Sequence, residues 1–582
     1  MRRSWFLATA LLITLFGGLL RLDAYAGKYG TLEHPAWARV LTHDVAPFAR
    51  HLRPAAVAWG REARPYVGGD PFSYLKYARE MTSFYQPHVR EPVFLATTRL
   101  GLWLLDDQDA GVSLASAAAS VIAIFATCLL GAALISPLGG LIAGALMAVE
   151  YDAIGLAVEG WRDDTFAAAF ILSTCALLRF RKQPSFGTAL LVGFATGAAC
   201  LTRITSITFV VPGLAWVVLS GGGSVRERLT HGATAVLIAT ALVAPFLISC
   251  GLSTGDPLFS INAHTTYYRF AEGAASRAPM SATEYIRAKT ASHPVATLDV
   301  GVTGLLVRPF VSKWSPFDIW IRGLATALSW SALAGLVLWT FTPAGRLMLV
   351  LLAASLLPYA FTWNIGSGGD WRFTLHVYPV FIVAGVYAWS SLVAAARHRP
   401  AIRPLALRAS AVAVIALVLT AAYAALPWWS ASEAIARKEA LTIEADERSR
   451  VFYRQGWSDS HLEGNVNVRV SRVPQATVHV PLPVKRAYEI VLRFDPVAPP
   501  LQERVTVLLN RHMLGTLRLA WDPGRVGSYR LSLPEAWVRA GDNEITLVPE
   551  RLVPAAAAGP MFTWLKDDDS LGVRMWYLRV LD

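Results

Sequence analysis

Residues 111–135 read GVSLASAAASVIAIFATCLLGAALI, a run without a single charged side chain. About 20 apolar residues are enough to cross the roughly 30 Å hydrocarbon core of a bilayer. Similar runs recur along most of the chain, at 4–21, 111–135, 138–155, 164–180, 186–202, 204–220, 231–250, 319–341, 347–363, 373–395 and 408–427. The sequence therefore predicts a membrane protein that is all-α in its spanning part, with about eleven transmembrane helices.

The composition agrees with this interpretation. Of 582 residues, 54% are hydrophobic and 16% are charged, and the mean hydropathy is +0.42. A soluble protein of this length would carry more charge. The formal net charge of +12 does not indicate a nucleic-acid partner, because no basic domain stands apart and membrane proteins collect Lys and Arg in cytoplasmic loops. The four cysteines lie in or beside apolar runs and have no zinc or disulfide spacing.

The basic residues predict the orientation. With the N-terminus in the cytoplasm, alternating spans put every arginine-rich short loop on the same side, as the positive-inside rule requires. These residues are Arg2, Arg3, Arg179, Arg181, Lys182, Arg226, Arg228, Arg346, Arg397, Arg399, Arg403 and Arg408. Merging 186–202 with 204–220 would break the rule, so we expect a hairpin there with Arg203 at its outer tip. The first span lacks a clear cleavage site and is interpreted as a retained signal anchor of a bacterial-type inner-membrane protein.

Three long segments then lie outside the cell membrane, at about 22–110, 251–318 and 428–582. Residues 93–105 are apolar but short, which is typical of an interfacial helix. From about 445 the pattern changes to short alternating runs such as YEIVLRF and ERVTVLLN, separated by turns such as DPVAPP and NRHMLG. Period-two alternation predicts strands. We expect a transmembrane domain over 1–430 and an extracytoplasmic β-sandwich of jelly-roll type over 431–582.

Asp70 is the first candidate for chemistry. It follows Gly68 and Gly69 and precedes Pro71, so it could simply be the N-cap of a helix. A carboxylate at the outer face of the membrane could also act as a general base toward an acceptor hydroxyl. A cap position projects the carboxylate from a rigid element, so the two interpretations are compatible.

Three further residues of the first outer segment could contact a substrate. Tyr74 and Tyr77 lie on the helix face that carries Asp70, where aromatic rings form either a sugar platform or a contact with the bilayer interface. Glu91 could be a second polar contact, or could form a salt bridge with Arg90 or Arg79.

Asp163 and Asp164 open the span at 164–180, where a helix dipole favours anions. They could alternatively bind an acceptor or, with Asp70, a divalent cation such as Mg²⁺ or Mn²⁺, because hard cations prefer oxygen ligands. An adjacent pair of acids is a weak metal signal, so no cofactor is certain and the metal remains open.

A lipid-phosphate substrate needs positive charge near the outer interface. Arg203 and Arg372 both fall there, and arginine pairs with phosphate in bidentate fashion. Each could instead only snorkel to the interface. Arg269 lies in the second long outer segment and could cover a lipid groove. The chain has no phosphate-binding P-loop, nucleophile elbow or HExxH motif, which argues against an ATP-driven pump or a soluble-type hydrolase.

Four stretches resemble the GT-C superfamily of polytopic membrane glycosyltransferases, in particular bacterial relatives of the protein O-mannosyltransferases and aminoarabinose transferases. They are GGDPFSYLKYAR with REPVF, EGWRDDTF, GFATGAACLTRITS and GDPLFSIN. The resemblance covers about residues 1–400. It implies that an acid of the first outer segment is the catalytic base, with Asp70 the best match and Asp23 its rival. Asp70-Pro71 and GWRDD are also similar to the metal-dependent oligosaccharyltransferase subunit, and the tail resembles carbohydrate-binding jelly rolls.

We therefore expect an inverting glycosyltransferase. It would move a sugar from a polyprenyl-phosphate donor to an extracytoplasmic glycan, lipid or protein, with Asp70 as base and with Arg203 and Arg372 on the leaving phosphate. A polymerase or ligase with a polyprenyl-diphosphate donor is the related alternative. A transporter or flippase should carry ionisable residues at mid-membrane, whereas the acids here gather at the ends of spans. A surface-assembly scaffold built on the β-domain is a further alternative.

Overall fold

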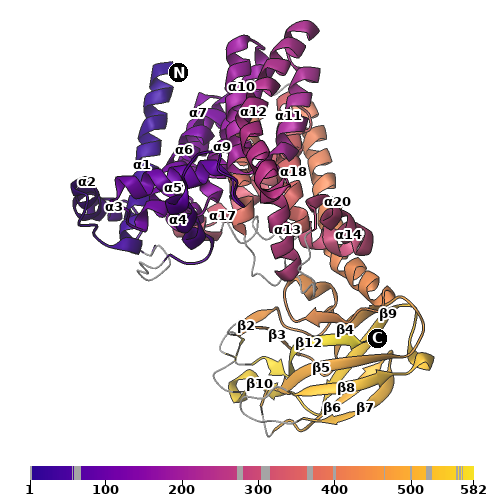
Figure 1. The fold of residues 1–582 in the computed structure, drawn as a ribbon. Helices are drawn as coiled ribbons and strands as arrows, with labels where there is room; N and C mark the ends of the chain where they lie inside the picture. The colour runs from indigo at the N-terminus through magenta and orange to yellow at the C-terminus, as the bar shows by residue number, and fades with distance from the viewer. Residues whose placement is uncertain are drawn as a thin grey trace. The chain divides into compact units, whose positions relative to one another are not determined.

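The computed structural model describes residues 3–55, 57, 67–271, 280–302, 315–362, 371–397, 402–463, 466–498, 501–519, 527–558, 562, 565–566 and 568–581. The chain forms two compact units. The helical unit contains Met1–Ala288 and Val300–Ala416, and the β unit contains Lys289–Asp299 and Leu417–Asp582. Figure 1 shows that helices make up the first and that strands dominate the second.

The helical elements of the chain, in order, are α1 (Arg3–Tyr29), α2 (Ala36–Arg39), η1 (Val40–Val45), α3 (Ala46–Arg50), α4 (Asp70–Glu80), α5 (Pro92–Leu104), α6 (Ala110–Leu134), α7 (Pro137–Ala148), α8 (Tyr151–Ala157), α9 (Asp163–Lys182), α10 (Phe186–Thr202), η2 (Ile204–Ser206), α11 (Ile207–Ser220), α12 (Val225–Thr254), α13 (Phe259–Ala271), α14 (Ala282–Ser292), α15 (Pro294–Val302), η4 (Ser315–Ile319), α17 (Leu324–Trp339), α18 (Pro343–Thr362), η6 (Trp371–Val377), α19 (Tyr378–Arg397) and α20 (Ile402–Ala436). Every predicted span coincides with one of them or, at 138–155, with the pair α7 and α8.

The protein is a multi-span membrane protein. Six helices of the described residues are long and apolar enough to cross a bilayer, and the pair α7–α8, bent by 61°, would make a seventh. The other predicted spans fail this test for physical reasons. The helices α10, α11 and α17 have 17, 14 and 16 residues, and α9 carries charges in its first and last turns. The predicted number of about eleven spans is therefore not confirmed.

The prediction for the first span was too short. Residues 4–21 were expected to cross the membrane, but α1 continues to Tyr29 and includes Arg21. The buried guanidinium of Arg21 donates to the Ser120 hydroxyl at 2.8 Å and to two backbone carbonyl oxygens. These bonds pair Nε and Nη1, whereas Nη2 has no hydrogen-bond partner among the described residues, so most of the charged group is compensated as the helix continues through the bundle.

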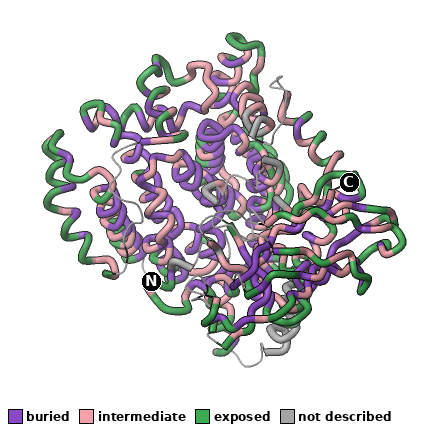
Figure 2. The backbone as a smooth tube through the Cα atoms, turned by 90° about the horizontal axis from the view of Figure 1, so that it is seen from below, coloured by how far each residue is buried: buried purple, intermediate pink, exposed green. Residues whose placement is uncertain are grey.

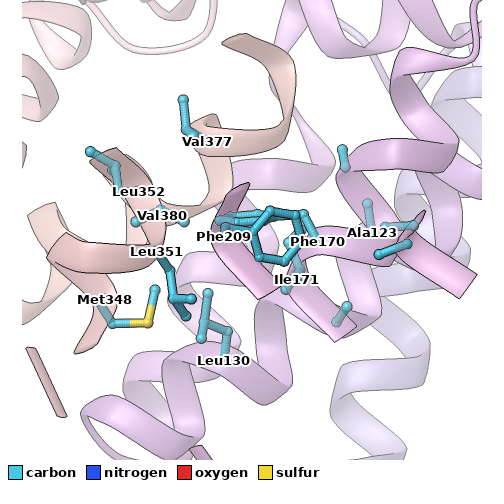
Figure 3. Packing of buried hydrophobic residues seen from close by; sticks show 14 of the residues in the cluster. Ala123, Leu130, Phe170, Ile171, Phe209, Met348, Leu351, Leu352, Val377 and Val380 are labelled. Atoms are coloured by element: carbon cyan, nitrogen blue, oxygen red, sulfur yellow. The ribbon is translucent and has the colours of Figure 1, made fainter. Parts of the chain in front are cut away.

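The core of the helical unit lies where α6, α9, α11, α18 and η6–α19 meet. Figure 3 shows Phe170 of α9 against Phe209 of α11, with ring centroids 4.9 Å apart in an edge-on arrangement. Figure 2 shows the buried positions concentrated on the inner faces of the helices. Glycine permits the closest helix contact of the outer-loop region: a Cβ on Gly101 of α5 would lie 2.3 Å from the carbonyl oxygen of Gly111 of α6. This contact fixes α5 against the bundle.

The strands of the β unit are β1 (Leu441–Glu444), β2 (His461–Glu463), β3 (Val466–Val470), β4 (Ala476–Leu482), β5 (Tyr488–Pro496), β6 (Arg504–Leu509), β7 (His512–Arg518), β8 (Ser528–Leu533), β9 (Gly541–Pro549), β10 (Val553–Pro554), β11 (Ser570–Leu571) and β12 (Val573–Leu581). One sheet has the order β2-β3-β12-β5-β8 with β1 paired to β12, and a second has the order β4-β9-β6-β7. Their inner faces share one apolar core, so the unit is a β-sandwich.

The predicted strands of the tail are confirmed, but the set was incomplete. Runs at 476–483, 488–494, 503–510, 514–520, 528–534 and 543–549 coincide with β4 to β9. The NRHMLG turn closes the hairpin β6–β7, with Asn510 and Arg511 both at positive φ, as a two-residue turn requires. The prediction missed β12, which pairs with β1, β3 and β5 at the centre of its sheet. The sandwich is observed, and the jelly-roll connectivity stays a prediction.

Candidate functional site

Asp70 begins α4 (Figure 1). Its predecessor Gly69 is the N-cap at φ 68°, a left-handed conformation that glycine adopts without strain. Asp70 was expected to be the cap itself, but it lies one residue inside the helix, and α4 has no side-chain cap. Its side chain is 37% exposed, and its Oδ1 lies 3.5 Å from Nη2 of Arg90. The carboxylate is therefore accessible and has a cation at the limit of hydrogen-bond distance.

Arg90 lies between three groups. Its guanidinium is 5.5 Å from the ring centroid of Tyr74 and donates to Nε2 of His264 on α13. Burial and the charges of Arg90 and Arg162 lower the pKa of His264, so the neutral ring can accept this bond while Nδ1 bonds the carbonyl oxygen of Ser260 at 2.5 Å. Arg90 is thus held in place from both sides.

Tyr74 is buried, and its ring packs edge-on against Phe94 at 5.1 Å. Burial raises the pKa of its phenol; Arg162 and Arg90 act in the opposite direction, whereas Asp70 and Asp163 add to the rise. Four charged side chains from three segments of the chain therefore surround this one hydroxyl. Its neighbour Tyr77 lies against His88, at 4.2 Å between ring centroids. Tyr74 supports the charged groups, and a sugar platform formed by its ring stays a prediction.

Glu91 is buried and is the N-cap residue of α5. Its expected salt bridge with Arg90 or Arg79 is wrong: its Oε2 accepts from Arg162 at 2.5 Å, and its Oε1 accepts the backbone N–H of Ile204 at 3.0 Å. Arg79 instead pairs with Asp107 and Asp109, as the closure of the α5–α6 turn brings these acids to it. Burial acts to raise the pKa of Glu91, but the charges of Arg162 and His264 and the hydrogen bond from the Ile204 backbone together outweigh it and lower that pKa.

Arg203 lies at the break between α10 and η2, as the predicted hairpin required. It is buried, and its two terminal nitrogens donate to the Asp163 carboxylate and the Tyr359 hydroxyl. The rings of Phe166 and Tyr359 lie 5.2 and 5.4 Å from the guanidinium. Burial would lower the pKa of Arg203, but the charge of Asp163 raises it, so Arg203 stays charged.

These contacts join into one series, which we name the ion-pair chain. Its members are Asp70, Arg90, Glu91, Arg162, Asp163 and Arg203. Contacts join Asp70 to Arg90, Glu91 to Arg162 and Asp163 to Arg203, while the remaining links are adjacent residues in the sequence. Four segments of the chain, at Asp70, at Arg90 and Glu91, at Arg162 and Asp163, and at Arg203, therefore meet at one place. One end of the ion-pair chain, at Asp70, is accessible, and the rest is buried.

Three other candidates lie beside or beyond the ion-pair chain. Asp164 is buried next to Asp163, and its charge acts on Arg21 of α1. Arg269 is half-buried in the last turn of α13, the helix that carries His264. Arg372 belongs to η6, which packs against α9, and its side chain lies outside the described residues.

The carboxylates do not form a metal site. Among the residues that the structure describes, no three His, Cys, Asp or Glu side chains lie close enough together to hold a metal ion. Asp163 bonds Arg203, and Asp164 lies where it acts on Arg21, so the three candidates Asp70, Asp163 and Asp164 do not form one ligand set. These residues do not fit a resident divalent cation.

The rival base, Asp23, has a different environment. Its side chain is 2% exposed. Its carboxylate oxygens form ion pairs with Nε of Arg53 at 2.7 Å and with Nε of Arg50 at 3.4 Å. A buried carboxylate bonded to two guanidinium groups is closed to an acceptor hydroxyl, whereas the Asp70 carboxylate is 37% exposed. The geometry favours Asp70.

Sequence reasoning named Arg90 only as a possible partner of Glu91 and did not single out Arg162, although both arginines connect the acids to one another. Both lie inside quoted motifs, REPVF and EGWRDDTF, beside residues that were singled out. The available signal was the balance of charge: a motif that buries Glu91 or Asp163 needs a cation to pair with each.

The comparisons with known proteins bear on these same residues. Residues 86–248 match the family described as dolichyl-phosphate-mannose-protein mannosyltransferase. The matched segment contains five of the six members of the ion-pair chain, from Arg90 to Arg203. The resemblance to the GT-C superfamily is confirmed. No curated protein sequence matches the chain.

Three solved structures are similar to parts of the chain. The archaeal oligosaccharyltransferase AglB from Archaeoglobus fulgidus, in complex with an inhibitory peptide and a dolichol-phosphate, has 12% identity and a TM-score of 0.43, covering 71% of this chain and 54% of that one. ArnT from Cupriavidus metallidurans in the apo state has 16% identity and a TM-score of 0.34, covering 63% and 64%. A family 35 carbohydrate-binding module from an environmental isolate has 16% identity and a TM-score of 0.15, covering 22% and 91%. The chain spans about half the length of the oligosaccharyltransferase structures it matches.

Proposed function

We propose that the protein is a membrane glycosyltransferase that transfers a sugar from a polyprenyl-phosphate donor to an extracytoplasmic acceptor, with inversion. The observation that carries this proposal is the ion-pair chain, which ends in an accessible carboxylate, Asp70, at the end of the helical bundle where α4 and α5 lie. The match of residues 86–248 to a family of lipid-phosphate-dependent mannosyltransferases supports the same reaction class.

Asp70 would take the proton from the acceptor hydroxyl as that oxygen attacks the anomeric carbon. One displacement at this carbon inverts its configuration, and the sugar–phosphate bond breaks as the new glycosidic bond forms. Arg90 lies close enough to orient the Asp70 carboxylate. The reaction leaves a polyprenyl phosphate, whose charge needs a cation nearby.

The arginines divide this work. Arg203 has both terminal nitrogens bonded, so we assign it to holding Asp163 and the η2 turn in place. Arg372, in the segment that precedes α19, remains the proposed ligand of the leaving phosphate, with Arg269 of α13 as a second contact. No step in this scheme uses a metal ion.

The topology belongs to the same proposal. About eleven spans would place the N-terminus in the cytoplasm and the β unit outside an inner membrane. There the sandwich, proposed as a jelly roll, would hold the acceptor glycan or dock a partner. The bend between α7 and α8 would make these two helices one broken span.

Purified protein offered a panel of radiolabelled polyprenyl-phosphate sugars should transfer label from at least one of them to an acceptor fraction. Asp70→Asn should abolish this transfer, whereas Asp70→Glu should retain part of it. If Asp23→Asn abolishes transfer in folded protein and Asp70→Asn does not, the base assignment is wrong.

Two further arms decide between the alternatives. Transfer from a polyprenyl-diphosphate donor alone would favour a polymerase or ligase. Movement of intact donor across a vesicle membrane, without label on any acceptor, would favour a flippase. Loss of transfer on chelation, restored by Mg²⁺ or Mn²⁺, would contradict the metal-free scheme.

A further inference from the structure

A long apolar groove runs along the side of the helical unit. It has a volume of about 910 Å³, at the upper end of the roughly 300–1,000 Å³ of ordinary ligand pockets, and is formed by α5, α6, α9 and α10, with Ala344 of α18 at one side. Its wall on α9 runs from Thr165 to Lys182, which is about 26 Å at 1.5 Å per residue. The groove is therefore long enough for an extended acyl chain.

The groove exists because small side chains line its floor. Ala119 of α6, Ala168 of α9 and Ala195 of α10 line it, so the helix surfaces recede where they meet. Larger apolar side chains form its rim, among them Leu172 and Phe194, which are exposed. An exposed apolar hollow on a membrane-spanning bundle faces lipid, so its natural occupant is a lipid chain.

The charges at the two ends of the groove are different. Near Thr165 and Thr202 the neighbouring cations, Arg162 and Arg203, are buried and paired with carboxylates. At the opposite end the groove is lined by Arg179, Arg181 and Lys182. Within the described ranges none of these three makes an ion pair, and the Nε of Arg181 is buried without a hydrogen-bond partner. An anionic headgroup is therefore complementary to this end alone.

We propose that the groove binds an anionic phospholipid, with its phosphate at Arg179, Arg181 and Lys182 and an acyl chain along the alanine-lined floor toward α5. Basic pockets between transmembrane helices bind anionic headgroups, and each Lys or Arg near a membrane surface adds about 1 kcal/mol of attraction. The bound chain would contact Val93, Leu100 and Leu104 of α5, and so support the helix whose first turn follows Glu91. This lipid site is separate from the proposed donor site and does not rest on the proposed function.

The test is lipid binding to purified full-length protein in detergent, measured by native mass spectrometry and by the unfolding temperature on titration with one lipid at a time. Phosphatidylglycerol should bind more tightly than phosphatidylcholine of the same chain length. R179Q/K182Q should weaken phosphatidylglycerol binding by about 10- to 30-fold, because two unit attractions are lost. Arg226→Gln, an exposed cation at the start of α12 that does not line the groove, is the matched control and should change it little.

A steric variant tests the binding of the acyl chain without any change of charge. Ala169→Trp places a ring in the groove without changing any charge and should weaken binding of phosphatidylglycerol, whereas Ala145→Trp on the exposed face of α7 should not. Equal binding of the two lipids, or wild-type affinity in both R179Q/K182Q and Ala169→Trp, would overturn the proposal. Polyprenyl phosphate that displaces phosphatidylglycerol and keeps its affinity in R179Q/K182Q would show instead that the groove holds the donor from its other end.

Discussion

The charges at the two ends of α9 have different environments. At the first turn, Asp163 meets Arg203, and the preceding Arg162 meets Glu91, so each of these buried cations has a carboxylate partner. At the last turn, Arg179, Arg181 and Lys182 have no carboxylate partner in the part of the chain that the structure describes. Paired buried charges are fixed in position, because separating them leaves an uncompensated charge in an apolar medium. Unpaired cations at the edge of a groove are free to meet an anion that comes and goes.

The difference suggests how one helix can serve two purposes. Its first turn connects the segments that carry Glu91 and Arg203 and leaves Asp70 accessible. Its last turn is a binding surface. Variants can test this difference in three places. They change the accessible end of the ion-pair chain, then its buried part, and then the packing that supports it.

The largest expected effect is on turnover. Asp70→Asn should lower kcat by roughly 10²- to 10⁴-fold, the range that general-base catalysis contributes. The unfolding temperature should change little, since the carboxylate is 37% exposed and lies as far as 3.5 Å from Nη2 of Arg90. Asp44→Asn removes another exposed acid of the same outer segment and should leave both quantities unchanged. Equal losses in the two variants would show that Asp70 acts only through the charge of the segment.

The next effect is on stability. Arg203→Met leaves Asp163 buried without its partner and should lower the free energy of unfolding by about 3–5 kcal/mol. The double variant with Asp163→Asn should lose less than the sum of the two single variants, which a double-mutant cycle of denaturation in detergent would measure. Arg179→Met, at the other end of α9, should stay within about 0.5 kcal/mol of wild type. An additive cycle would mean that the two charges do not stabilise each other.

The sequence indicated most members of this site but not their pairing. Asp70, Glu91, Asp163 and Arg203 stand out because charge is rare in this chain and because each lies at the edge of an apolar run. The partner of Asp163 is 40 residues away and is reached only because α9 and α10 pack as a hairpin. Glu91 and Arg162 are 71 residues apart, and they meet because α5 packs on α6 and α10, the helices that both pack against α9. No local pattern encodes such distances.

The same limit explains the missed strand. Regular alternation of side-chain type along the sequence predicted β4 to β9 correctly, and in β6 the buried positions follow it, with every second residue buried. In β12 the pairing with β5 shifts between Met575 and Tyr577. Buried positions are Met575 before the shift and Leu578 after it, so the period of two is interrupted in the middle of the strand. A bulge thus removes the signal from the strand on which the sheet is centred.

A smaller effect should follow from the packing of α5. Gly101→Ala places a Cβ within 2.3 Å of the Gly111 carbonyl oxygen, so backbone must move, at a cost of about 1–3 kcal/mol. Since α5 begins directly after Glu91, transfer activity should fall as well. Gly27→Ala in α1, where a Cβ meets nothing within 4 Å, is the matched control and should be neutral or slightly stabilising. A neutral Gly101→Ala would show that α5 is not held by this contact.

The smallest effect concerns pH and tests how firmly the neutral His264 holds Arg90. Burial and the neighbouring arginines lower the pKa of His264 below its ordinary value of 6.5, so below pH 6.5 the unfolded chain binds a proton that the folded chain does not. Stability contributed by the neutral ring is therefore present above pH 6.5 and is lost as the pH falls, by about 1 kcal/mol between pH 6.5 and 5.5. His264→Gln should remove this part of the slope, whereas His43→Gln, an exposed histidine, should not. If His264→Gln keeps the wild-type slope, the ring is already protonated beside Arg90, and the two groups repel rather than bond.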